Sequence, residues 1–245
     1  MNLIFSPSNL KTFVQCPAKF KAMNIDKTVP YVQSEQAKRG EQLHALMETA
    51  INHGWDAVQW TDAKSQPHAH KFTGIIRGLM DNGYEVHTEV GVATDGYGHG
   101  LDYWAKAPQN FLRCRIDVLL LNKEKGNAII FDHKTGKKYG ADALQLQANA
   151  VCVRDTYGIS KFITIFDYLD SGDMVKETID VSGVDLGETD PLKFASSPCL
   201  ELLNAVSDAQ RALAMNKFIP TKNRFCSYCP LYEGGMCIHS DHTYK

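Results

Sequence analysis

The chain has 245 residues, of which 44% are hydrophobic and 22% are charged, and its formal net charge is −2. This composition is typical of a globular protein and excludes collagen, coiled coil and intrinsic disorder. The length corresponds to one or two domains. The charge excludes a uniformly basic coat for nucleic acid, although it leaves room for a local basic groove.

The targeting and cysteine patterns indicate a cytoplasmic chain. The sequence has no run of 18 apolar residues, and its first residues lack the basic region and long apolar run of a signal peptide. We therefore expect no membrane contact. Seven cysteines in a reducing compartment point to metal or cluster ligation rather than to disulfides.

Helices are predicted in the first third of the chain. Ser6-Pro7-Ser8 is a helix start, with a hydroxyl cap followed by a proline in the first turn, and the helical segment continues to Phe20. Apolar spacing predicts a second helix over 34–53, ended by Gly54. A third is predicted over 68–82.

The remaining chain alternates strands and helices. Short β-branched or alternating runs predict an antiparallel meander of strands over 85–92, 98–106, 111–121 and 127–133. A helix over 141–157, strands over 161–169 and 174–181, and a long helix over 187–216 follow, before an irregular tail from 218. We read residues 1–245 as one α/β domain with a central mixed sheet flanked by helices. The sheet core spans 85–182, and a small cap is built from both termini, 1–30 and 218–245.

An Asp-x-Lys pair stands at the end of the predicted strand 127–133. Because side chains alternate along a strand, Asp132 and Lys134 project from one face and His133 from the other. The preceding strand carries Asp117, which an antiparallel pairing would place across from Asp132. Two converging carboxylates can hold Mg²⁺ or Mn²⁺, and the lysine can orient or activate a bound water. The alternative is a surface Asp-x-Lys pair that forms only a weak salt bridge.

Four motifs in order resemble the RecB-like branch of the PD-(D/E)XK nuclease superfamily. Gly40-Glu41-Gln42-Leu43-His44 matches its Gly-x-x-x-His, and Arg115-Ile116-Asp117 matches its Gly-x-Asp with Cys114 at the usual glycine. Asp132-His133-Lys134-Thr135-Gly136 matches its third motif fully. Gln145 matches the fourth, Gln-x-x-x-Tyr, with Asn149 in place of tyrosine.

The resemblance implies a restriction-endonuclease-like core and assigns roles to the matching residues. It implies that His44, Asp117 and Asp132 bind the metal, that Lys134 is catalytic, and that Gln145 contacts the lysine or phosphate. Glu89, on the first predicted strand, is a possible further acid. Taken alone, His44 would be read as an ordinary helix histidine.

Three late cysteines, Cys226, Cys229 and Cys237, have ligand-like spacing, and Cys16 in a Cys-Pro context is the candidate fourth ligand. The pattern resembles the CRISPR-associated RecB-like exonucleases and the nuclease subunit of AddAB-type helicase–nucleases. This resemblance implies one [4Fe–4S] cluster in the cap, whereas spacing alone favours structural zinc. Cys114 and Cys152 are expected in the core.

The expected function is a metal-dependent DNA exonuclease acting on single-stranded or end-bearing DNA in a bacterial, archaeal or phage-infected cell. Lys137 and Lys138 flank the site as candidate DNA contacts. Other candidate phosphate-binding cations are Lys19, Lys21, Lys38, Arg39, Lys217, Lys222 and Arg224. The chain has no phosphate-binding loop for a motor, so it would act alone or with a separate helicase or recombination protein. A catalytically idle DNA-end-binding or assembly module and a structure-selective endonuclease are the alternatives.

Overall fold

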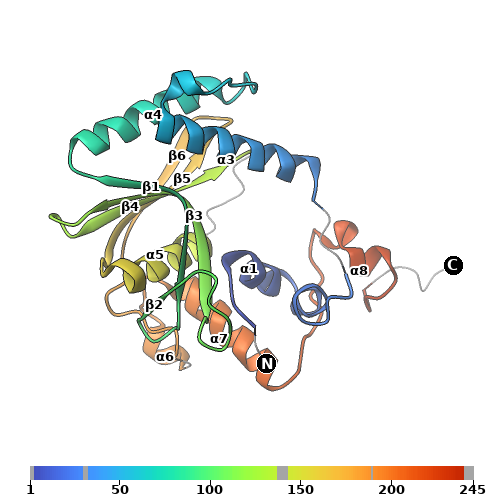
Figure 1. Ribbon diagram of the computed structural model, residues 1–245. Helices are drawn as coiled ribbons and strands as arrows, with labels where there is room; N and C mark the ends of the chain where they lie inside the picture. Colours follow the sequence, from blue (N-terminus) through green and yellow to red (C-terminus); the bar gives the residue numbers. More distant parts are fainter. Residues whose placement is uncertain (1–2, 30–32, 137–142, 189, 240–245) are drawn as a thin grey trace.

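A computed structural model gives the fold of residues 3–29, 33–136, 143–188 and 190–239 (Figure 1). The helices are α1 (Pro7–Gln15), α2 (Pro17–Phe20), η1 (Lys21–Ile25), α3 (Glu35–His53), η2 (Trp55–Ala57), α4 (Gln66–Asp81), α5 (Ala143–Tyr157), α6 (Pro191–Phe194), α7 (Leu200–Ala214), η3 (Cys226–Tyr228) and α8 (Pro230–Glu233). The strands are β1 (Glu85–Thr94), β2 (Gly100–Leu101), β3 (Leu112–Asn122), β4 (Asn127–Lys134), β5 (Lys161–Tyr168) and β6 (Asp173–Asp180).

A mixed six-stranded sheet in the order β2-β1-β3-β4-β5-β6 forms the centre of the fold. All neighbouring strands are antiparallel except β4 and β5, which are parallel and are joined through α5. A parallel connection needs such a crossover. Short turns join β1 to β2, β3 to β4 and β5 to β6, whereas the chain passes through β2 and a longer loop between β1 and β3. The expected α/β fold with a central mixed sheet is confirmed.

Helices cover both faces of the sheet (Figure 1). On one face α3 and α4 bury Leu43, Met47, Phe72 and Ile76 against strand residues such as Phe131. On the other face, α1, α5 and α7 form the larger apolar core. Its buried helix residues include Leu10, Phe13, Leu146, Ala148, Val151, Leu202, Leu203 and Val206. The helices on both faces are therefore anchored to the sheet by apolar packing.

Two predicted elements are wrong. The predicted strand 98–106 is a strand only at Gly100–Leu101. The Asp102 side chain accepts a hydrogen bond from the Trp104 backbone N–H at 2.8 Å, a turn that competes with the strand ladder. The predicted helix 187–216 is divided into α6 and α7, because Pro198 lacks an N–H and disfavours a helical conformation in the residue before it.

Both termini contribute to a small apolar cluster. Ala22, Val29 and Leu231 are buried together, and Cys229 and Cys237 pack against them. Ser6 caps α1 as predicted, accepting from the Asn9 backbone N–H while Asn9 Oδ1 accepts from the Ser6 N–H. Within the described residues, no helix is long and apolar enough to cross a membrane.

Candidate active site

The candidate site lies where β3 and β4 separate. The two strands pair from Asn122–Asn127 to Val118–Phe131 and no further, although β4 continues to Lys134 beside β5. Asp117 and Asp132 are therefore the first residues beyond the shared ladder. Asp117 spans the opening: its Oδ2 accepts a hydrogen bond from the His133 backbone N–H at 2.7 Å.

A paired bend in β1 and β3 turns two acids into this opening. Val86 and Val90 are an even number of residues apart, yet Val86 packs in the α3–α4 core and Val90 in the α5–α7 core. Val118 and Ile116 show the same exchange of faces on β3. Glu89, between the two β1 valines, has a φ of 47°, a left-handed conformation that costs energy for a residue with a side chain. Such strain is common at functional sites.

His44 of α3 completes a possible metal site with the two acids. Its Nδ1 lies 3.4 Å from Asp117 Oδ1 and 3.8 Å from Glu89 Oε1. One ligand atom of each residue lies within 4.8 Å of the others. The opposite ring nitrogen of His44, Nε2, is 3.2 Å from the His133 carbonyl, to which it can donate. A metal-binding histidine usually donates its second N–H in this way, so Nδ1 is oriented as a ligand.

Asp132, Lys134 and Gln145 form a second group of side chains beside the first. Lys134 Nζ forms an ion pair with Asp132 and donates to Gln145 Oε1 at 2.9 Å. Gln145 Nε2 in turn donates to Asp132 Oδ1. Asp132 and Lys134 thus share a face, as the strand period predicts, and Gln145 of α5 bridges the acid and the lysine.

Burial and mutual charge shift the protonation of these groups. For Asp132, burial and the neighbouring Asp117 charge outweigh Lys134 and raise the pKa to about 6. For His44, burial opposes the charged form, but Asp117, followed by Asp132 and Glu89, outweighs it and raises the pKa to about 9. Burial and Asp117 also raise the pKa of Glu89, whereas His44 overcomes burial to lower the pKa of Asp117. Such crowded carboxylates require a cation, here a protonated histidine and a lysine.

Asp170 ties the end of the Asp-x-Lys motif to α3. It accepts from the Gly136 N–H at 3.0 Å and from Arg39 Nη2 at 2.7 Å. Arg39 also donates to Asp62 at 2.8 Å, so this predicted phosphate-binding cation is committed to internal carboxylates. Gly40, next along the helix, allows close approach, because a Cβ there would lie 3.4 Å from Thr135 Oγ1.

His133 is held from behind by a buried carboxylate. Asp167 Oδ2 accepts from His133 Nδ1 at 2.8 Å, and Asp167 Oδ1 accepts from His68 Nε2 at 2.5 Å. Burial disfavours the Asp167 charge, but the two histidine hydrogen bonds outweigh it and lower the pKa of Asp167. Because the His133 backbone contacts both Asp117 and His44, this carboxylate indirectly fixes the candidate metal site.

A profile of the PD-(D/E)XK nuclease superfamily matches residues 4–233, nearly the whole chain. The chain belongs to the PD-(D/E)XK nuclease superfamily. Members of this superfamily use divalent metals and act on DNA, which agrees with the acid–histidine cluster. The candidate active site of the nuclease is therefore the opening between β3 and β4.

Two solved structures are similar to the nuclease at low identity. SSO0001 shares 14% identity, with a TM-score of 0.43, and the match covers 98% of this chain and 88% of that one. An alkaline exonuclease from Laribacter hongkongensis, LHK-Exo, shares 13% identity, with a TM-score of 0.34, and the match covers 96% of this chain and 95% of that one. No curated protein matches the sequence.

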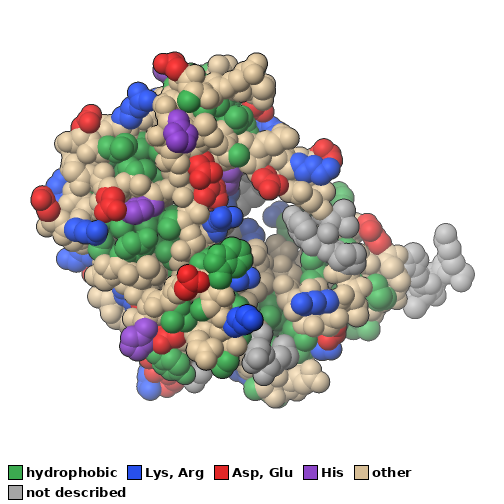
Figure 2. Space-filling view, viewed as in Figure 1, with side chains coloured by type: hydrophobic (Ala, Val, Ile, Leu, Met, Phe, Trp, Pro, Cys, Tyr) green, Lys and Arg blue, Asp and Glu red, His purple; other side chains and the backbone are tan. Residues whose placement is uncertain are grey.

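A hollow opens onto the acids of the nuclease. A cavity of about 560 Å³ is lined by α3 and by strand residues that include Glu89 and Arg115. Figure 2 shows acidic and histidine side chains at the rim of a central hollow, with Lys and Arg side chains beside it. Two members of the proposed metal site, His44 and Glu89, line this cavity. Lys137 and Lys138, the predicted DNA contacts, lie outside the described residues.

The four clamp cysteines, Cys16, Cys226, Cys229 and Cys237, line one cavity of about 90 Å³. Two of them accept backbone hydrogen bonds, Cys16 Sγ from Thr221 N–H at 3.5 Å and Cys226 Sγ from Asn223 N–H at 3.2 Å. Cys16 and Cys229 each precede a proline that begins a four-residue helix. The proline keeps each cysteine extended and ends the preceding segment, which is why the predicted helix through Phe20 is interrupted at Cys16.

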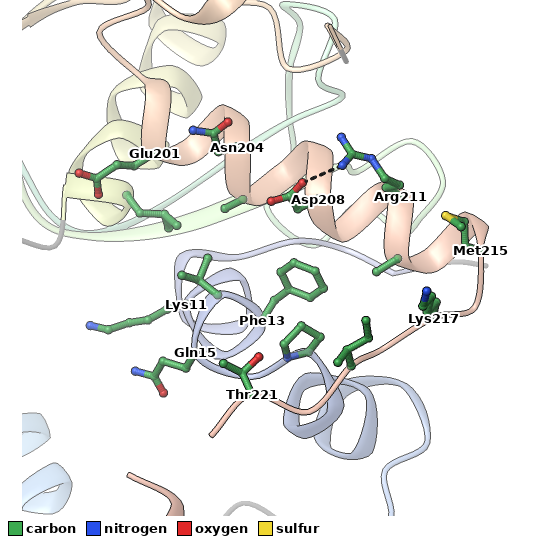
Figure 3. Close-up of a pocket in the computed structure, with 16 residues that line it drawn as sticks. Lys11, Phe13, Gln15, Glu201, Asn204, Asp208, Arg211, Met215, Lys217 and Thr221 are labelled. Carbon is green, nitrogen blue, oxygen red and sulfur yellow. Dashed lines mark ion pairs between the residues drawn. The ribbon is translucent and has the colours of Figure 1, made fainter. Parts of the chain in front are cut away.

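Another groove of the nuclease lies between α1, α7 and the segment 217–221 (Figure 3). Its volume is about 780 Å³, and its wall is mainly apolar, with Phe13 and Met215 among the lining residues. Asp208 and Arg211, which face it, pair with each other at 3.3 Å. The described lining residues offer no converging carboxylates, so this groove is not the catalytic centre.

Several residues of the site carry no motif signal. Asp167 lies in the predicted strand 161–169 and Asp170 directly follows it, and both are ordinary acids in sequence terms. The contact of Asp167 with His133 becomes apparent only from the parallel pairing of β4 with β5, which aligns these two residues. A pairing hypothesis for these two strands would have found it, because paired residues share a face of the sheet.

Proposed function

We propose that the nuclease is an Mg²⁺- or Mn²⁺-dependent exonuclease that hydrolyses single-stranded or end-bearing DNA. The observation that carries the metal-dependent part is the convergence of His44, Glu89 and Asp117 within 4.8 Å, next to Asp132 and Lys134. The preference for ends rests on the resemblance of the four motifs to RecB-like exonucleases.

The residues fit a divalent cation. His44 Nδ1 and the Asp117 and Glu89 carboxylates would hold it, with Asp132 as a further oxygen ligand once it is ionised. When bound, the metal supplies charge neutralisation at the phosphodiester and lowers the pKa of a bound water. The ion pair between Lys134 and Asp132 supports a role for both groups at one reaction centre.

The protein side chains position the water and the phosphate. Lys134 donates to Gln145 and pairs with Asp132, which fixes its ammonium group above the Phe166 ring at 5.3 Å. A fixed ammonium group can orient the attacking water and stabilise charge that develops on the phosphate. Gln145 holds the lysine and the acid in register, and Asp117 fixes the backbone between them through His133.

Cleavage of labelled DNA tests the proposal. With manganese, the wild-type nuclease should shorten linear single strands progressively and leave closed circular single strands intact. Cutting of circles would replace the exonuclease with an endonuclease. Binding of DNA ends without cleavage under any divalent metal would favour an idle end-binding or assembly module.

We propose further that the four clamp cysteines hold a [4Fe–4S] cluster, as in the RecB-like members that the sequence resembles. Their cavity of about 90 Å³ exceeds the space that one small ion needs. Among described residues, no three of the sulfur atoms lie within 4.8 Å of one another, a spacing wider than tetrahedral zinc favours. Backbone N–H groups directed at Cys16 and Cys226 suit charged sulfur ligands.

Metal analysis distinguishes a [4Fe–4S] cluster from structural zinc. Protein purified without oxygen should be brown and contain about four irons per chain for one cluster. A colourless protein with one zinc per chain would contradict the cluster and support structural zinc.

We also propose that the chain works with a separate helicase or recombination protein in the cytoplasm, which co-purification from the native host would test.

A further inference from the structure

We propose that Trp104, together with Arg113 and Lys106, binds an unpaired nucleotide of the substrate strand beside the metal site. This inference rests on the proposed nuclease function and adds a substrate-binding subsite to it. Trp104 is 75% exposed, although a large apolar ring gains by leaving water. It lies in the segment that sequence analysis assigned to a strand, 98–106.

The position of this subsite follows from the geometry of β3. Cys114 and Ile116 point into the α5–α7 core, so Arg113 and Arg115 lie on the opposite face of the strand, toward α3. Arg115 lines the catalytic cavity with His44 and Glu89. Arg113 lines a second cavity, of about 340 Å³, with Trp104 and Lys106. The two cavities are therefore adjacent along one face.

Tyr103 connects the catalytic cavity to Trp104. Its ring lies directly on Gly91, where an added Cβ would be only 2.7 Å from Tyr103 Cγ. Gly91 pairs with Arg115 and is two residues from Glu89. Arg113 stacks over the Tyr103 ring at 5.2 Å, and the Trp104 ring meets Tyr103 edge-on at 5.0 Å. Asp117 is four positions beyond Arg113 on β3, a distance on the order of 13 Å along a strand.

Charge in the second cavity favours a polyanion. Its lining residues include the cations Lys106 and Arg113 and no carboxylate; the other members are Ile4, Trp104, Ala105 and Ala107. An exposed indole beside cations is the combination with which single-stranded nucleic acids are bound, since every base has a face that can stack. Paired bases in a duplex already cover their faces, which is why we assign an unpaired nucleotide.

The loop that carries Trp104 is held in place before any substrate arrives. Buried Asn110 donates from Nδ2 to the carbonyls of Tyr103 at 3.3 Å and Ala105 at 3.0 Å. Asp102 accepts from the Trp104 N–H at 2.8 Å. A fixed aromatic loses little conformational entropy on binding, so this arrangement suits a stacking platform.

Fluorescence anisotropy with a labelled oligothymidylate in EDTA, where cleavage is blocked, tests the subsite. Trp104→Ala should weaken single-strand binding about tenfold or more, and Trp104→Phe should retain most of it. A blunt duplex should lose less affinity. Tyr97→Ala is the matched control, because Tyr97 is 79% exposed on the neighbouring turn and packs near Gly187 instead. Equal single-strand binding by wild type and Trp104→Ala would overturn the proposal.

Intrinsic fluorescence gives an independent readout. Oligothymidylate should quench wild-type emission, and Trp104→Phe should abolish that quenching while still binding, because Trp55 and Trp60 stack on each other at 5.3 Å elsewhere. Unchanged quenching in Trp104→Phe would contradict the stacking. Hydrolysis of bis(p-nitrophenyl) phosphate with manganese separates the nuclease proposal from the Trp104 proposal. A diester this small, bound at the metal site, does not extend to Trp104, so Trp104→Ala should cleave it at the wild-type rate. Failure of the wild type on it would count against the nuclease function alone.

Discussion

The backbone N–H of His133 donates to Asp117 Oδ2 at 2.7 Å and joins two strands whose ladder has already ended. This hydrogen bond sets the width of the opening in which the candidate metal ligands lie. It also means that Asp117 has two tasks, since one oxygen fixes the backbone and the other faces His44. Substitution of Asp117 should therefore affect geometry as well as charge.

Removal of the principal catalytic groups should abolish cleavage. Asp117→Ala, Asp132→Ala and Lys134→Ala should each lower the rate on manganese-treated single strands by at least about 100-fold, because each removes a metal ligand or the water-orienting charge. Circular dichroism should show an intact fold. Full activity of Asp132→Ala, or wild-type activity in EDTA, would contradict the site. His44→Ala should weaken metal use, with partial rescue at higher manganese concentration.

Asp167 should affect metal binding without touching the metal. Asp167→Asn weakens its two histidine contacts and should lower manganese affinity about 10- to 100-fold, as loss of an outer hydrogen-bond partner does at metal sites. Titration with manganese followed by electron paramagnetic resonance measures the change. Asp173→Asn, on the exposed end of β6, is the control and should bind manganese as wild type does. Unchanged affinity in Asp167→Asn would remove its positioning role.

The stability of the metal-free protein should fall as the pH rises from about 6.5 through about 9. The pKa of His44 is raised from 6.5 to about 9, so the favourable charge of His44 is fully present below 6.5 and is lost as the pH passes 9. The loss is at most about 3 kcal/mol. Asp132, whose pKa is raised to about 6, also makes stability fall as the pH rises. Its neutral form is favoured in the folded protein, and this contribution is lost between about pH 4 and pH 6.

Thermal melting in EDTA at several pH values measures this dependence. His44→Gln should flatten the curve above pH 6.5. Manganese should restore stability at high pH, because the metal then takes the place of the proton that His44 has lost. At lower pH the metal must displace that proton, so manganese binding weakens as the pH falls. A wild-type curve that stays flat between pH 6.5 and 9 would contradict the raised pKa.

The seven cysteines should fall into two classes. Cys16→Ala, Cys226→Ala, Cys229→Ala and Cys237→Ala should each lose iron and about 3–5 kcal/mol of stability, because the clamp closes a loop across most of the chain. Cys114, Cys152 and Cys199 are buried, and alanine at these positions should keep the iron and cost only packing energy. Bound iron and melting temperature of all seven variants test this. A full iron content in Cys16→Ala would place the fourth ligand elsewhere.

Gly91 should be intolerant of a side chain. Gly91→Ala would place its Cβ 2.7 Å from Tyr103 Cγ, so the ring has to move away from β1. We expect a stability loss of about 1–3 kcal/mol and weaker single-strand binding. Gly78→Ala, which meets nothing within 4 Å on the surface of α4, is the control. Melting temperature and anisotropy measured together would show whether Tyr103 positions the Trp104 platform.

Local rules sufficed for the parts of the site that lie on one element. The strand period placed Asp132 and Lys134 together, and the order of motifs brought Gln145 to them. The bend at Glu89 and Asp117 could not be predicted from the sequence. The side chains of β1 and β3 exchange faces of the sheet at this pair of residues, and the apolar pattern of either strand alone does not reveal the exchange. Asp167 and Asp170 act only through β5 pairing and loop contacts. Trp104 was misplaced because the turn formed by Asp102 depends on a side chain rather than on apolar alternation.

The packing of α1 against α5 and α7 determines when the nuclease can fold during its synthesis. Leu10 and Phe13 are synthesised well before α7, yet they pack in one core with residues of α7. Contacts this distant in sequence form slowly. A nascent chain already carries every candidate ligand from His44 to Gln145 while the wall behind them is still open. We expect ribosome-bound chains that lack α7 to be inactive, so that cleavage activity appears only once α7 has been synthesised and packed.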